Sequence, residues 1–81
     1  MSAHVMFPRC DKAYRVSWEL ADFLNDVMED FSIRYGSVEK TPRVLRRLRK
    51  AAAVGGEDAE VAERMLEELK RDGGVELFIS V

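Results

Sequence analysis

The feature that most constrains the fold is a change in hydrophobic period along the chain. Apolar and polar residues alternate in Ala13–Trp18 and again in Val75–Val81. Between these segments, apolar residues recur every three or four positions in three stretches, as they do in amphipathic helices. The apolar faces of such helices have to be buried against another layer, and a sheet built from both ends of the chain supplies one. We therefore predict a small α+β fold of the order ββαααβ, with a short sheet of two or three strands packed by three amphipathic helices.

A hairpin is expected where the chain begins. Ala3–Phe7 alternates weakly, Ala13–Trp18 alternates cleanly, and the polar residues 8–12 between them form a loop. Because a two-stranded sheet is marginal in water, we expect Val75–Val81 to lie beside Ala13–Trp18 as a third strand.

The first helix is predicted over Trp18–Phe31. Ser17 is a suitable N-cap, since its hydroxyl can accept a hydrogen bond from a free amide of the first turn. The segment Ser32–Lys40 that follows is interpreted as a connector with its turn at Gly36.

The second helix is predicted over Pro42–Val54, because Thr41 provides a hydroxyl cap and proline suits the first helical position. A glycine pair ends it, and the third helix begins at Glu57 or Asp58, where acidic side chains suit the positive end of the helix dipole. The side chains expected in the core are Phe23, Leu24, Val27, Leu48, Leu66 and Leu77.

Length and composition favour one small folded domain over residues 1–81. The chain is 47% hydrophobic and 35% charged, which is typical of a folded protein and not of a disordered one. Cys10 is the single cysteine, so no internal disulfide can form, as in proteins of reducing compartments. Met1–Phe7 lacks the pattern of a signal peptide, and no apolar run has the length of a membrane span. We expect a cytoplasmic protein with no membrane contact.

Charge is sorted between the first two predicted helices. The first carries only carboxylates, namely Glu19, Asp22, Asp26, Glu29 and Asp30. Like charges four residues apart cost a few tenths of a kcal/mol, and the helix dipole disfavours anions near the C-terminus. The carboxylates are present despite this cost in stability, so we interpret the acidic face as a contact surface for a basic partner. The alternative is a solvated face that keeps the protein soluble.

The second predicted helix carries the opposite charge. Arg43, Arg46, Arg47 and Lys50 lie at i, i+3, i+4 and i+7, and hence on one side. Such a face can hold phosphates or carboxylates. The alternatives are a solvated face, or arginines paired with carboxylates of the neighbouring helices. No aromatic residue shares this side, which weakens any case for stacking on single-stranded nucleic acid.

Catalytic and metal-binding signatures are absent from the sequence. His4 and Cys10 are two ligand types without a second pair, which does not make a zinc site. Any base-assisted nucleophile would have to use His4, and the carboxylates lie on solvated faces where nothing raises their pKa. We expect no catalytic residue, no cofactor and no enzyme activity.

The preferred interpretation is a non-catalytic protein-binding module. A small regulator, inhibitor or adaptor of the kind found in phages and mobile elements would present the acidic face to a partner with a basic surface. We also expect either a homodimer or a strand-mediated contact with another partner through Val75–Val81, which is apolar on both faces and has no lysine or proline to protect a sheet edge.

The alternative is a DNA-binding regulator that uses the basic helix. A strand at Ala13–Trp18 followed by two helices resembles the ribbon-helix-helix family in element order. In that family the strand presents polar residues to the major groove, and here only Arg15 and Ser17 could do so. The connector Ser32–Lys40 is also long for that motif.

Overall fold

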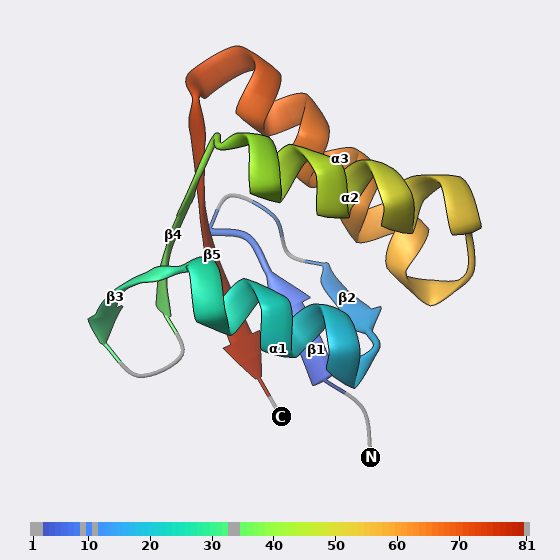
Figure 1. The fold of residues 1–81 in the computed structure, drawn as a ribbon. Helices are drawn as coiled ribbons and strands as arrows, with labels where there is room; N and C mark the ends of the chain where they lie inside the picture. The colour runs from blue at the N-terminus through green and yellow to red at the C-terminus, as the bar shows by residue number, and fades with distance from the viewer. Residues whose placement is uncertain (1–2, 9, 11, 33–34, 81) are drawn as a thin grey trace.

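The computed structural model describes residues 3–8, 10, 12–32 and 35–80. The elements follow one another along the chain as β1 (Ala3–Met6), β2 (Ala13–Val16), α1 (Trp18–Val27), β3 (Glu29–Ser32), β4 (Tyr35–Glu39), α2 (Pro42–Val54), α3 (Glu57–Asp72) and β5 (Gly74–Ser80) (Figure 1). The α+β class and the three helices agree with the sequence prediction. The order is ββαββααβ, with two strands more than predicted. No helix in the described part of the chain is both long and apolar enough to cross a membrane.

The sheet has five antiparallel strands in the order β2-β1-β5-β4-β3. The hairpin of β1 and β2 is confirmed, with Ala3 opposite Val16. The predicted pairing of Val75–Val81 with Ala13–Trp18 is wrong, because β1 lies between β5 and β2. Strand β5 is central and is paired on both sides, so the open edge expected at Val75–Val81 does not exist. The outer strands of the described sheet are β2 and β3.

The segment between α1 and α2 differs most from the prediction. Helix α1 ends at Val27, four residues before the predicted helix end at Phe31, and the chain passes through the extended Met28 into β3. Gly36 is not a turn but a buried strand residue opposite Leu77. The physical reason is that β4 satisfies the backbone hydrogen-bonding groups of β5 on the side away from β1. Pairing with a distant strand thus decides the conformation of a segment that lacks a strong local preference.

Apart from the C-terminal end of α1, the helix ends are set by local sequence signals as predicted. The hydroxyls of Ser17 and Thr41 each accept a hydrogen bond from a first-turn backbone N–H at 3.2 Å. Pro42 occupies the first turn of α2. Helix α3 ends at Gly73, whose φ of 74° is the left-handed conformation that favours glycine. These caps explain why α2 and α3 have the bounds that the sequence indicated.

All three helices lie on one face of the sheet. Along β5, Val75, Leu77 and Ile79 are buried, whereas Glu76 and Phe78 are exposed on the opposite face. Helix α1 packs over β1 and β4, α3 packs over β2 and β5, and α2 packs mainly on α3 (Figure 1).

The core agrees with the sequence prediction to a large extent. Among the predicted core residues, Leu24, Leu48 and Leu77 are fully buried. Phe23, Val27 and Leu66 are partly buried and pack against the core.

Candidate functional site

The acidic face predicted on the first helix is shorter than expected. Glu19, Asp22 and Asp26 lie at i, i+3 and i+7 on α1 and are exposed, so they form one line along the helix. Glu29 and Asp30 do not belong to this face, because their backbone is part of β3. Their side chains lie outside what the structure describes. The face predicted with five carboxylates therefore has three.

One feature of the sequence favours the shorter helix. A helix extended to Phe31 would place Glu29 and Asp30 at its C-terminal end, where the helix dipole disfavours anions. Ending the helix at Val27 removes both carboxylates from that unfavourable position. The local penalty in the longer helix was thus evidence against its length.

The basic face of α2 is present and faces α1 in part. Arg43, Arg46 and Lys50 are exposed, and Arg47 is half-buried. Arg43 Nη2 donates a hydrogen bond to Asp26 Oδ2 at 3.0 Å. Both side chains are about two-thirds exposed, so the pair contributes at most about 1 kcal/mol to stability. For Arg43, the interpretation as a partner of a neighbouring carboxylate is confirmed.

An aromatic ring from another helix lies beside the basic face. The guanidinium carbons of Arg43 and Arg47 lie 5.4 Å and 5.9 Å from the ring centroid of Phe23 on α1, within cation–π range. No signal within α2 indicates this contact, because the ring comes from another helix. Both arginines cover Phe23, so the ring is not an open platform for a nucleic-acid base.

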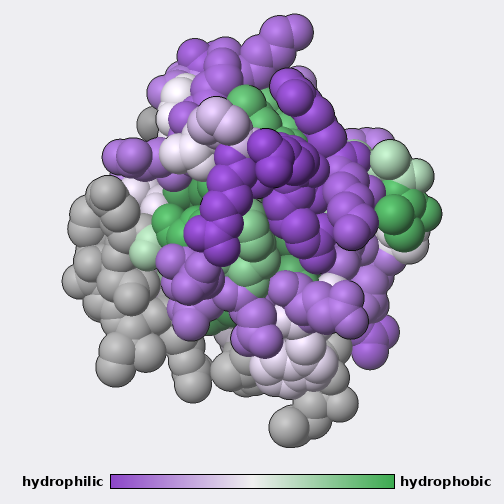
Figure 2. All heavy atoms as spheres, viewed as in Figure 1, coloured by the Kyte–Doolittle hydropathy of each residue, from purple (hydrophilic) through white to green (hydrophobic). Residues whose placement is uncertain are grey.

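A shallow groove separates the N-terminal half of α1 from the C-terminal end of α2. Its volume is about 450 Å³, and the residues that line it are Glu19, Arg47, Lys50, Ala51, Val54, Gly55 and Asp58. Both signs of charge meet in it, and Val54 at its rim is 78% exposed. Figure 2 shows hydrophilic side chains over most of this side of the molecule, with apolar atoms in a narrow strip between them and in a separate patch. The lining is suited to ion pairing and hydrogen bonding and not to enclosing an apolar ligand.

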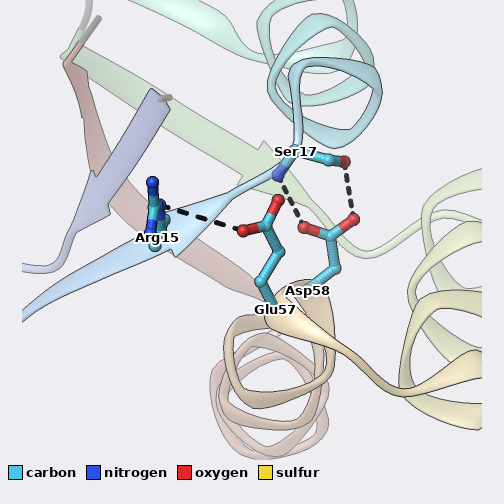
Figure 3. A network of polar contacts seen from close by, with 4 residues as sticks. All are labelled: Arg15, Ser17, Glu57 and Asp58. Atoms are coloured by element: carbon cyan, nitrogen blue, oxygen red, sulfur yellow. Dashed lines mark hydrogen bonds and ion pairs between the residues drawn. The ribbon is translucent and has the colours of Figure 1, made fainter. Parts of the chain in front are cut away.

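A carboxylate from α3 fixes the start of α1. Asp58 accepts a hydrogen bond from the backbone N–H of Ser17 at 2.7 Å and another from the Ser17 hydroxyl at 2.6 Å (Figure 3). In the same view, Arg15 Nε lies 3.9 Å from Glu57 Oε2. The sequence marked Asp58 as a helix start but offered no sign of a partner 41 residues away. This contact holds the N-terminal turn of α1, and with it Glu19, in a fixed place beside α3.

Two hydrogen bonds perturb titratable groups elsewhere. The ammonium of Lys12 donates to Glu60, and this contact raises the pKa of Lys12. The hydroxyl of Tyr35 donates to Glu76 at 3.0 Å, and this hydrogen bond raises the pKa of Tyr35. Within residues 3–8, 10, 12–32 and 35–80, no group of three or more His, Cys, Asp or Glu side chains is placed to hold a metal ion.

Comparison of the chain with protein-family models, with curated proteins and with solved structures finds no match.

Proposed function

We propose that the protein is a non-catalytic protein-binding module that presents the acidic line of α1 to a basic surface of its partner. The observation that carries the proposal is that Glu19 and Asp22 are exposed and form no ion pair with any residue that the structure describes. Neither carboxylate is neutralised by a cation of the described residues. A small regulator, inhibitor or adaptor would use their charge to steer and orient a partner of opposite charge.

The surroundings of these carboxylates support such a role. The contact of Asp58 with Ser17 fixes the turn that carries Glu19. At the other end of the line, Asp26 contacts Arg43, and both side chains remain accessible to a partner. A cationic partner group can add to this exposed pair without the burial of an unpaired charge, which would be costly.

The test is quantitative affinity capture from nuclease-treated lysate of the organism that encodes the chain. Glu19→Lys with Asp22→Lys reverses two of the three carboxylates of the acidic line, and Arg46→Glu with Arg49→Glu is the matched control, with a charge change of equal size and opposite sign on exposed positions. Far-UV circular dichroism verifies that both variants fold. We expect a protein captured by the wild type and by the control to be lost from the acidic-line variant.

Affinity for the purified partner should also fall as salt rises, since exposed charges are screened over about 8–10 Å at ordinary ionic strength. A partner bound equally well by the wild type and the acidic-line variant would contradict the proposal.

A second candidate is contact with nucleic acid through α2. It is favoured by Arg46, Arg49 and Lys50, which are exposed and have no carboxylate partner among the described residues. The candidate rests on this helix alone, because β3 and β4 separate α1 from α2, unlike the element order of ribbon-helix-helix proteins.

The two candidates predict opposite outcomes in a DNA-binding assay. If α2 contacts phosphates, the anisotropy of a labelled DNA duplex at low salt should rise with the wild type and not with the Arg46→Glu, Arg49→Glu variant. The Glu19→Lys, Asp22→Lys variant should then bind as well as or better than the wild type, because it removes repulsion. Loss of all binding only in the arginine variant would favour this candidate over the first.

A further inference from the structure

The face of the sheet opposite the helices carries an apolar row. Ala13 lies opposite Met6, Met6 lies opposite Phe78, and Phe78 lies opposite Tyr35. These four side chains therefore lie side by side on β2, β1, β5 and β4. Tyr35 stacks on Phe78 with ring centroids 4.3 Å apart and an interplanar angle of 27°.

Such a row is unusual on a sheet face that water reaches. An antiparallel sheet with one solvated face normally alternates apolar residues inward with polar residues outward. Phe78 nevertheless remains 40% exposed. Apolar side chains that continue across four strands of a solvated face indicate a contact surface.

Charges flank the row in an ordered way. On one side of the row lie His4 and Arg15, which are opposite each other on β1 and β2. On the other side lie Glu76 on β5 and Glu39 on β4. Among the described residues of this face, the basic groups are thus at one end and the carboxylates are at the other.

We propose that this face binds the same face of a second copy of the chain, with the two-fold axis along the apolar row. That rotation places row on row and brings the Glu76 end of one copy over the end of the other copy that carries His4 and Arg15. A two-fold axis along the strands would instead place the Glu76 end of one copy over the Glu76 end of the other, which like-charge repulsion disfavours. The sheets pack face to face, and each copy contributes the same patch, as a two-fold interface requires.

The charged groups keep their internal contacts in this arrangement. Arg15 lies on the outer strand β2 with its Nε 3.9 Å from Glu57 of α3, so its exposed guanidinium lies at the edge of the sheet and adds positive charge to that end of the face. Glu76 accepts from the Tyr35 hydroxyl with one oxygen, and carboxylates accept several hydrogen bonds.

The size of the face sets the expected strength of the dimer. Five strands span about 19 Å across the sheet at the usual spacing between neighbouring strands. The apolar row and the charged residues on either side of it cover about 15 Å along the strands. The area buried by two such faces is below the roughly 1,200 Å² of stable complexes, so the dimer is a weak, reversible one. Helix α1 lies on the other side of the sheet, so the inference does not depend on the proposed function.

The first test compares two apolar-to-acidic variants. Sedimentation velocity and amide-correlation NMR spectra are recorded from about 20 μM to about 1 mM protein, the range of a weak complex. We expect concentration-dependent shifts at Met6, Ser37 and Phe78. Phe78→Glu should weaken dimerisation by about tenfold or more, whereas Val54→Glu, at the most exposed large apolar residue of the described chain, should leave it unchanged.

The second test addresses the orientation of the two copies. Arg15→Glu leaves carboxylates at both ends of the face, and Glu76→Arg leaves an arginine at both ends, so each variant alone should dimerise more weakly than the wild type. An equimolar mixture of the two should favour the heterodimer, because groups of opposite charge then face each other at both ends. Circular dichroism verifies the fold of each variant.

Three results would overturn the proposal. They are a monomeric wild type at about 1 mM, equal weakening by Val54→Glu and Phe78→Glu, and the absence of a heterodimer in the mixture. Shifts confined to the outer edge of β2 would likewise overturn it, since they would indicate edge-to-edge pairing of strands.

Discussion

Replacing Leu48 by alanine provides the strictest test of how α2 is packed. Leu48 is fully buried in the core, on the side of α2 that the other elements cover. The change removes three carbon atoms, which at about 0.8 kcal/mol each represents about 2.4 kcal/mol of lost transfer free energy. The cavity that remains adds to this, so we expect a loss of about 3–5 kcal/mol in the free energy of unfolding. A chain of this length has a total stability of about 4–12 kcal/mol, so the variant should be close to unfolding.

The assay is urea unfolding followed by far-UV circular dichroism, with the denaturant dependence (m value) compared between variants. Leu45→Ala is the matched control on the same helix, because Leu45 is only half-buried and should cost less. Val54→Ala, at a position 78% exposed, should change stability by no more than about 0.5 kcal/mol. If Leu48→Ala lowers the free energy of unfolding by less than about 1 kcal/mol with an unchanged m value, the packing described for α2 is refuted.

The other predictions concern polar contacts. Asp58→Ala should destabilise the protein by about 2–3 kcal/mol in thermal or urea unfolding, because it leaves the N–H and hydroxyl of Ser17 without their acceptor. Glu60→Ala, which removes only an exposed ion pair of α3, should have almost no effect, and equal losses in the two variants would contradict this assignment. The pKa of Tyr35 should lie above its ordinary value of 10.0, mainly because its hydroxyl donates to Glu76 and partly because of burial and repulsion from that carboxylate. Folding thus favours the neutral phenol, so this contribution to stability is complete below pH 10.0 and is lost as pH rises through the raised pKa. Titration of phenolate absorbance should show a lower pKa of Tyr35 in Glu76→Gln, and an unchanged value would rule out the hydrogen bond as its cause.

The candidate site could be predicted from the sequence only where one helix determines it. The spacing of Arg43, Arg46 and Lys50 within α2 placed them on one exposed side, and the structure has them there. The contact of Arg43 with Asp26 could not be located, because it depends on how α1 and α2 approach each other. The two charged surfaces inferred from sequence are consequently not independent, since they share this ion pair.

The open face of the sheet was also beyond sequence reasoning. Phe78 stood out as an apolar residue on the polar side of an alternating strand. Only the register across three strand pairs places it between Met6 and Tyr35. Tyr35 lies in the segment predicted as a connector, so no local pattern indicates the row.

Short-range chemistry in the sequence by itself determined the three helices and the hairpin. The hydroxyl caps at Ser17 and Thr41 and the left-handed glycine at Gly73 act within a few residues, and the apolar stripes need only the helical period. These signals do not depend on the rest of the fold. They therefore predict α2 and α3 closely and α1 at its start.

Tertiary structure alone decided the centre and the far side of the sheet. Segments 29–32 and 35–39 are short, and their strand conformation is stabilised by pairing with each other and with β5, far away in the chain. A strand gains its hydrogen bonds from a neighbour and not from itself, whereas a helix satisfies its own backbone. The same reason explains why β5 is a central strand between β1 and β4 and not an edge strand beside β2. No local pattern in Gly74–Ser80 indicates this position in the sheet.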